Sequence, residues 1–169
     1  FAERPENYVV KPVYAAFGNG VRVENLGMYD SVEEAHQEYS KSGAVIEEVI
    51  VQGEALSKIH AGSVNTLRIP TAIIKNEEGE PEIKLFHPSI RMGRGDSFVD
   101  NFSAGGVSAL IDAETGVIYT DGADKKGHTY ECHPDSGIRF KGFQIPKWDE
   151  AVSMVCLLYT SPSPRDRQK

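Results

Sequence analysis

The spacing of apolar and polar residues changes along the chain and predicts a hairpin followed by a helix. Apolar, β-branched stretches at 8–13 and 21–23 flank a glycine-bearing turn, which is typical of two paired strands. Ser31 followed three residues later by Glu34 has the pattern of a capping box. A helix is therefore expected to begin at Ser31 and to stop near Gly43.

The pattern after this helix predicts a series of antiparallel strands. Residues 44–51 form a run too apolar for a sheet edge, and residues 54–60 suit one or two helical turns. Apolar residues then alternate with polar ones at a period of two, as in strands. We expect strands at 64–75, 82–91, 107–112, 117–120 and 137–143, and a helix from Trp148. The order β-β-α-β followed by hairpins is an α+β layout.

Composition excludes several classes of protein. With 40% apolar and 25% charged residues among 169, the chain can bury a core and is not a disordered polyelectrolyte. No apolar run has membrane-spanning length, so no membrane insertion is expected. A net charge of −7 argues against a general nucleic-acid partner but allows local anion sites. Two cysteines argue against a disulfide scaffold.

The two ends of the sequence differ from the rest. The chain begins at Phe1 within what reads as coil, so we expect a fragment at this end. Residues 156–166 back-translate to a string similar to the transposase adapter of short-read sequencing. We expect residues 156–169 to be an adapter artefact and to lie outside the fold.

Lys11 is the first candidate for chemistry. It lies in a strand between apolar neighbours, where its ammonium must extend to solvent or meet an anion. The following turn contains Gly18, Asn19 and Gly20, and glycine lets backbone N–H groups approach phosphate closely. An ordinary glycine-bearing hairpin explains the same pattern.

Two adjacent carboxylates, Glu47 and Glu48, lie in the predicted strand 44–51. Alternation places them on opposite faces, so we expect one to be partly covered. The alternative is a pair without function, in which one glutamate is hydrogen-bonded within the protein and the other is solvated.

Polar residues in the later strands form the most informative group. Asn65 and Arg68 lie in one strand, Arg91 ends the next, and Asn101 precedes a glycine pair. Polar side chains in strands are costly to bury unpaired. Guanidinium groups, amides and glycine loops together suit an oligophosphate with its metal.

His128, Cys132, His133 and Asp135 form a possible metal-ligand set. Their spacing matches no standard zinc finger or ribbon, and residues 133–137 have the composition of a turn. We expect no metal ligands here.

Several of these blocks, taken in order, resemble a known family. Residues 9–12, 18–20 and 46–50 are similar to the nucleotide-binding half of the ATP-grasp superfamily. The later blocks resemble the sugar-transfer-associated ATP-grasp family, related to alpha-L-glutamate ligases. They are Ser63–Arg68, Ile90–Arg94, Val99–Phe102 with Gly105 and Gly106, and His133–Asp135 with Gly142, Ile145 and Pro146.

The resemblance covers residues 7–155 and implies an ATP-grasp fold fragment. Residues 1–52 would form part of the small nucleotide-binding subdomain. Residues 53–155 would form part of the antiparallel C-terminal subdomain, without its late strands.

The resemblance also implies site residues. The cofactor-binding set would be Lys11 at the ATP phosphates, Gly18, Asn19 and Gly20 in the lid, Glu47, Glu48 and Ile50 at the adenine and hinge, Glu54 at the ribose, and Asn65 and Asn101 toward the phosphates. Arg68 and Arg91 would be catalytic and hold the transferred phosphate or the acceptor carboxylate.

The implied reaction is ATP-dependent joining of a carboxylate to an amine through an acyl phosphate, linked to surface polysaccharide or cell-envelope synthesis. The implied cofactors are ATP and Mg²⁺, and the partners are a small carboxylate and an amine substrate. ATP use implies a cytoplasmic location.

Catalysis by this chain alone is not expected. In the family the main Mg²⁺ ligands lie on strands that follow the helix near Trp148, and the adapter-like segment stands there. A non-catalytic nucleotide-binding module of a polysaccharide assembly system is the alternative. A plain β-rich interaction domain is a third.

Overall fold

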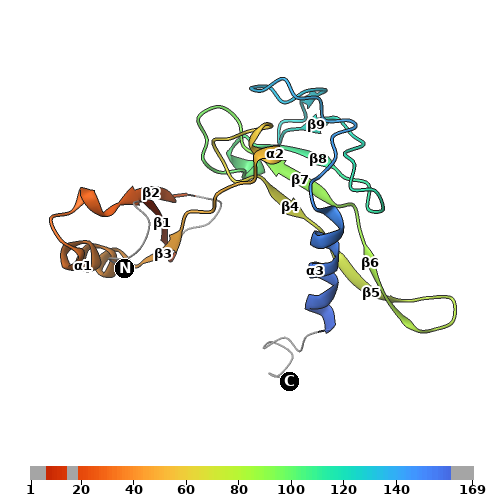
Figure 1. The fold of residues 1–169 in the computed structure, drawn as a ribbon, viewed down its shortest axis with the longest axis horizontal. Helices are drawn as coiled ribbons and strands as arrows, with labels where there is room; N and C mark the ends of the chain where they lie inside the picture. Colours follow the sequence, from red (N-terminus) through yellow and green to blue (C-terminus); the bar gives the residue numbers. More distant parts are fainter. Residues whose placement is uncertain (1–6, 15–18, 161–169) are drawn as a thin grey trace. The chain divides into compact units, whose positions relative to one another are not determined.

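The computed structural model describes residues 7–14 and 19–160, and the chain divides into two compact units. The units are residues 1–51 and residues 52–169, and each is described by itself (Figure 1). The predicted α+β class is confirmed in coarse form, since the described residues combine helices with antiparallel sheets.

The elements of the two units follow in chain order. The first unit contains β1 (Asn7–Pro12), β2 (Arg22–Asn25), the 3-10 helix η1 (Leu26–Met28), α1 (Val32–Ser42) and β3 (Ala44–Glu48). The second unit contains α2 (Glu54–Ser57), β4 (Thr66–Arg68), β5 (Thr71–Lys75), β6 (Pro81–Leu85), β7 (Ser89–Met92), the 3-10 helix η2 (Phe102–Ala104), β8 (Val107–Leu110), β9 (Gly122–Ala123), β10 (Thr129–Tyr130) and α3 (Trp148–Thr160).

The first unit is a three-stranded antiparallel sheet in the order β2-β1-β3, with α1 packed on one face. Its core consists of Tyr8 and Val10 from β1 and of Ala35 and Tyr39 from α1. The predicted hairpin is confirmed, because β1 pairs with β2. Alternation along β1 turns Lys11 away from the face that α1 covers.

Both predicted ends of α1 are confirmed. The Ser31 hydroxyl accepts a hydrogen bond from the Glu34 N–H at 3.1 Å, which satisfies one of the unpaired donors of the first turn. Gly43 ends the helix with φ 63, and its N–H donates to the Tyr39 carbonyl. Glycine adopts this left-handed conformation without a Cβ clash.

The expectation that residues 44–51 form an interior strand is wrong. Within the first unit β3 is an edge strand that pairs only with β1, and it ends at Glu48. Val49, Ile50 and Val51 follow it with exposed fractions of 37%, 68% and 89%. The apolar run therefore continues beyond the sheet as an exposed segment.

The second unit contains a five-stranded antiparallel sheet in the order β10-β9-β8-β7-β4 and a separate β5-β6 ribbon. Side chains from these strands, from the loops around them and from the last helix form one core. It consists of Ile59, Ile90, Met92, Val107, Ala109, Ile111, Ile118, Phe140, Ile145 and Trp148.

Two strands expected to be continuous are each broken by a proline. Residues 64–75 divide into β4 and β5 at Pro70, and residues 82–91 divide into β6 and β7 near Pro88. Proline lacks the N–H that a ladder needs and restricts the residue before it. The two breaks lie together, since the Phe86 N–H donates to the Pro70 carbonyl at 2.8 Å. The long hairpin therefore divides between the large sheet and the ribbon.

The expected strand at 137–143 is also absent from the described elements. Gly137 and Gly142 have φ of 70 and 91, which breaks the extended conformation, and one isolated bridge pairs Cys132 with Arg139. The short strands β9 and β10 form earlier in the chain, in the polar segment before residue 137.

The last helix anchors to the core through Trp148. Its indole Nε1 donates to the Ala113 carbonyl at 3.1 Å, and Val152 packs against the same core. The helix includes residues 156–160, part of the segment expected to lie outside the fold. Within the described part of the chain, no helix is long and apolar enough to cross a membrane.

Candidate functional site

The face of the first sheet opposite α1 combines apolar and charged side chains. The strand register places Val9, Val23 and Val45 on this face, together with Lys11 and Glu47. Val23 is 52% exposed and Val45 is 45% exposed, so the first unit itself leaves them uncovered. An apolar sheet face that carries a cation can receive a flat ring and an anion.

Lys11 and Glu47 form an ion pair across β1 and β3. The Lys11 ammonium donates to Glu47 Oε2, and both side chains are nearly half exposed. The pair orients the Lys11 ammonium along the open face, and an incoming anion can reach it.

The two predicted glutamates lie on opposite faces, as alternation requires. Glu47 pairs with Val9 and Glu48 pairs with Tyr8, whose side chain packs against α1. Both glutamates are exposed, so the expected partial cover of one of them is not observed. Ile50 lies beyond the strand in the exposed segment at the end of the first unit.

The glycine turn is described only in part. Asn19 and Gly20 form an exposed turn, whereas Gly18 lies outside the described residues. Gly20 has φ 72, and a Cβ added there would lie 2.8 Å from Pro12 Cγ. Glycine is therefore required where the turn rejoins the sheet.

A cavity of about 360 Å³ lies on the α1 side of the same unit. It is lined by Val32, Glu33, His36, Gln37 and Ile46. This lining contains no lysine or arginine, and Glu33 would repel phosphate. The cavity does not suit a nucleotide triphosphate.

The large sheet of the second unit has one polar face. The register places Arg68, Ser89 and Arg91 on this face, whereas Leu67 and Ile90 point into the core. Arg68 pairs with Ser89, two residues from Arg91, and its side chain is exposed. The structure thus brings the two predicted arginines onto one surface.

Arg91 is held by two neighbours. Its Nη2 donates to Thr66 Oγ1 at 3.0 Å and to Asp100 Oδ1 at 3.3 Å. The Thr66 hydroxyl in turn donates to Asp100 Oδ2. The guanidinium is 19% exposed and the carboxylate 9%, so the network is mostly buried but reachable at one side.

Asn65 faces the interior. Its Nδ2 donates to the carbonyls of Leu56 and His60, at 3.0 Å and 3.1 Å. These bonds use both amide donors to hold the segment that follows α2. Glu54, at the start of α2, is exposed and pairs with Lys58 at 3.0 Å.

Asn101 precedes the 3-10 helix η2 and shapes the glycine loop. Its carbonyl accepts from Ala104 at 2.9 Å and from Gly106 at 3.1 Å. Gly106 has no room for a side chain, because a Cβ would lie 2.6 Å from the Asp100 carbonyl oxygen. The loop therefore places Asp100 beside Arg91.

Asp124 is a buried carboxylate that sequence analysis did not select. His128 Nδ1 lies 3.0 Å from its Oδ2, the Tyr130 hydroxyl donates to the same oxygen at 2.9 Å, and Arg94 lies 3.7 Å away. Burial alone would raise the pKa of Asp124. The hydrogen bonds from His128, Tyr130 and the nearby backbone outweigh burial and hold this pKa well below its usual value.

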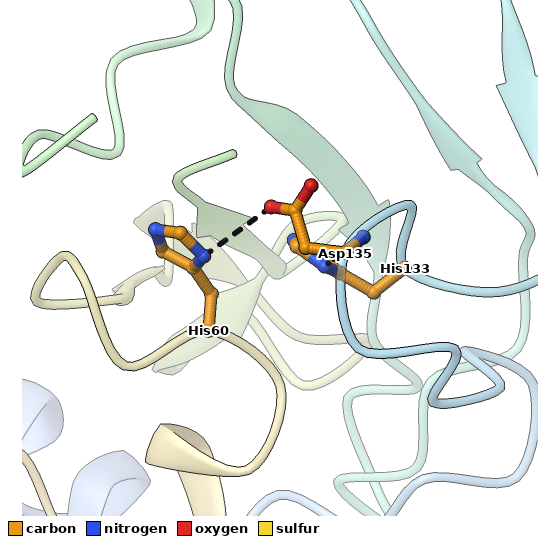
Figure 2. Close-up of side chains that lie close together, drawn as sticks. All are labelled: His60, His133 and Asp135. Atoms are coloured by element: carbon orange, nitrogen blue, oxygen red, sulfur yellow. Dashed lines mark hydrogen bonds and ion pairs between the residues drawn. The ribbon is translucent and has the colours of Figure 1, made fainter. Parts of the chain in front are cut away.

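His133 and Asp135 come together with His60 rather than with His128 and Cys132. Figure 2 shows the His60 ring facing the Asp135 carboxylate, with His133 beside it. One ligand atom from each of the three lies within 4.8 Å of the others. Burial lowers the pKa of the His133 imidazole. Sequence spacing could not reveal this set, because His60 is remote in the chain.

Comparison with known proteins gives one match. The model of a family described as sugar-transfer associated ATP-grasp matches residues 1–164, nearly the whole chain. No curated protein and no solved structure matches.

Proposed function

The chain belongs to the sugar-transfer associated ATP-grasp family, and on that basis we propose that it binds ATP on the open face of the β2-β1-β3 sheet. The observation that carries the proposal is Lys11, placed beside the exposed Val23 and Val45 on the face that α1 leaves uncovered. Val49–Val51, an exposed apolar run that directly follows β3, suits the adenine ring.

Each part of the first unit takes a role in this proposal. Lys11 binds the phosphates, and Glu47 orients its ammonium. Ile50 contributes an apolar side chain, and the turn at Asn19 and Gly20 approaches the phosphates with backbone N–H groups. Glu48 lies on the α1 side of the sheet, so we limit its role to its backbone.

For the second unit we propose an anion-binding role that rests on its own residues. Arg68 has the more exposed guanidinium, and we propose that it binds a phosphate or carboxylate group. Arg91 acts from its network with Thr66 and Asp100. Glu54 remains a proposed ribose contact. Asn65 and Asn101 act by holding the backbone around the site.

The proposed reaction is carboxylate–amine ligation. A carboxylate oxygen of the acid attacks the γ-phosphorus of ATP, the bond to the β-phosphate oxygen breaks, and ADP leaves. The amine then attacks the acyl carbon, and inorganic phosphate leaves with the electrons of the C–O bond. Positioning and charge neutralisation drive such a transfer, and no protein nucleophile is needed.

Magnesium in nucleotide sites takes oxygen ligands, usually one or two carboxylates together with the phosphates of the nucleotide. Among the described residues no three carboxylates gather into a cage of their own. No step of the proposal is routed through a metal. The second candidate function is a nucleotide-binding module that does not catalyse, since Lys11 and its sheet face require only binding.

We also propose that the reaction serves surface polysaccharide or cell-envelope assembly, and this part of the proposal rests on the family's name alone. The acid and amine would then come from sugar-transfer chemistry.

Titration of the chain with ATP tests the proposal. Lys11→Ala removes a charged donor worth about 1.5–3 kcal/mol, so the Kd for ATP should rise about 10- to 100-fold. Lys41→Ala is the matched control, since Lys41 is exposed in the last turn of α1 in the same unit. Equal ATP affinities for the wild type and Lys11→Ala would refute the proposed site.

A further inference from the structure

Three side chains from two distant segments converge on the loop that follows β7. His133 Nε2 lies 2.9 Å from the Gly93 carbonyl, and His60 Nε2 lies 3.2 Å from the Ser97 carbonyl. Between them, the Gly95 N–H donates to Asp135 Oδ2 at 2.7 Å. The three side chains, which lie together in Figure 2, therefore hold alternate residues of one loop.

These backbone contacts fix which ring nitrogens carry protons. A carbonyl oxygen only accepts, so Nε2 of both His60 and His133 must donate. In the neutral rings Nδ1 then keeps its lone pair. Nδ1 of His60 faces the Asp135 carboxylate, and Nδ1 of His133 accepts a long bond, 3.3 Å, from the Asp135 N–H.

The distance between His60 and Asp135 is long for a hydrogen bond and close to the distance between two ligand atoms of one metal ion. Nδ1 of His60 lies 3.5 Å from Oδ2 of Asp135. A charge-assisted N–H···O bond is about 2.7–2.9 Å long, so this separation is long for a shared proton. Two ligand atoms of a tetrahedral zinc ion, each about 2.1 Å from the metal, lie roughly 3.4 Å apart.

We propose that His60, His133 and Asp135 form a binding site for a divalent transition-metal ion of the zinc class. Two imidazole nitrogens and one carboxylate oxygen suit such an ion, whereas Mg²⁺ prefers oxygen ligands alone. At most 4.8 Å separates any two of the ligand atoms. The Asp135 side chain is 39% exposed and can move inward, and the long bond from the Asp135 N–H to His133 Nδ1 must break to free that lone pair for the ion.

The two histidines have the hydrogen-bonded surroundings that metal-binding histidines have in other proteins. A ligating histidine donates its other ring N–H to a carbonyl or carboxylate, and both rings do so here. Asn65 holds the His60 carbonyl, and the Ser63 hydroxyl accepts from the Gly93 N–H at 3.1 Å. A Cβ on Gly93 would lie 2.9 Å from His60 Cδ2, so glycine leaves room for the ring.

The ion would join the segment after α2, the loop 93–97 and the turn at 133–135. This loop directly follows β7, the strand that carries Arg91, so the metal would stiffen the backbone at one end of that strand. The metal proposal rests on these contacts alone and does not require that the first unit binds ATP.

Titration of the metal-free 169-residue chain with Co²⁺ and Zn²⁺ tests the site. We expect one ion per chain, with the visible ligand-field absorption of Co²⁺ bound by nitrogen and oxygen. Millimolar Mg²⁺ should not displace it. Zn²⁺ at 100 times its Kd should raise the Tm of the second unit by roughly 5–10 °C.

Variants locate the ligands. Asp135→Asn keeps an acceptor for the Gly95 N–H, and His60→Gln keeps a donor for the Ser97 carbonyl. Each should weaken Co²⁺ binding at least about tenfold while circular dichroism shows an intact fold. Cys132→Ser and His128→Gln are controls, since both residues are exposed and lie outside the cluster. They should change affinity less than twofold.

Two outcomes would overturn the proposal. The first is wild-type protein that shows no ligand-field absorption with stoichiometric Co²⁺, a result that does not depend on any variant folding. The second is Co²⁺ binding by Asp135→Asn and His60→Gln equal to that of the wild type, which would assign the ion to surface residues.

Discussion

Replacing Asp100 with asparagine should destabilise the second unit, because Arg91 and Thr66 meet at the Asp100 carboxylate. Oδ1 accepts from Arg91 and Oδ2 accepts from the Thr66 hydroxyl. Asparagine removes the charge opposite the guanidinium and turns one acceptor into a donor. The Thr66 hydroxyl or Arg91 then loses its partner in a mostly buried position.

The structure sets the size of this effect. Breaking a fully buried ion pair costs about 3–5 kcal/mol, and losing a hydrogen bond to a charged group costs about 1.5–3 kcal/mol. The pair is 3.3 Å long and Arg91 is 19% exposed, which places the cost near the lower range. We expect a loss of about 2 kcal/mol, which is about 30-fold in the folding equilibrium and about 4–8 °C in Tm.

Urea unfolding followed by Trp148 fluorescence measures this loss. Trp148 is the only tryptophan in the sequence and lies buried in the core of the second unit, so its signal reports on that unit. Arg139→Met is a matched control for charge removal, because Arg139 is exposed. Its unfolding free energy should stay within about 0.5 kcal/mol of the wild type.

A double-mutant cycle of Arg91→Met and Asp100→Asn completes the test. Groups in direct contact couple, so we expect an interaction free energy of about 1 kcal/mol or more. Additivity within about 0.5 kcal/mol would refute the reasoning, because it would mean that Asp100 does not hold Arg91 in solution.

Two further predictions concern stability. Gly116→Ala should cost about 2–4 kcal/mol and shift Trp148 fluorescence, because Gly116 has φ 71 and a Cβ there would lie 2.3 Å from Trp148 Cγ; an unchanged urea midpoint would contradict the packing. The pKa of Asp124 is lower in the folded state than its usual value of 3.8, so its ionised form stabilises the protein above that pH and the stabilisation is lost as the pH falls. Asp124→Asn should therefore unfold more easily at neutral pH and show a flatter decline in urea midpoint on acidification, whereas parallel declines would contradict the assignment.

Local signals in the sequence sufficed for the helix and the hairpin of the first unit. The ends of α1 follow from Ser31, Glu34 and Gly43, because capping bonds form between residues a few positions apart. The β1-β2 hairpin follows equally from its turn. Such signals are short-range, so one sequence contains them completely.

Long-range features were not predictable in the same way. An apolar run like 44–51 looks the same whether a neighbouring strand or a ligand covers it, and the structure leaves it exposed after an edge strand. The breaks at Pro70 and Pro88 were predictable in principle, since proline disfavours positions in a strand ladder. The alternation of apolar and polar residues, used by itself, did not reveal them. The cluster of His60 with His133 depends on chain folding that spacing does not encode.

Hydrogen–deuterium exchange with and without ATP tests the central claim, that ATP binds the open face of the first sheet, most directly. The account predicts that saturating ATP slows amide exchange in β1 and in residues 44–51, with less change in α1. Protection confined to α1 would assign ATP to the cavity lined by Val32 and Ile46. That result, or unchanged exchange throughout the first unit, would contradict the account.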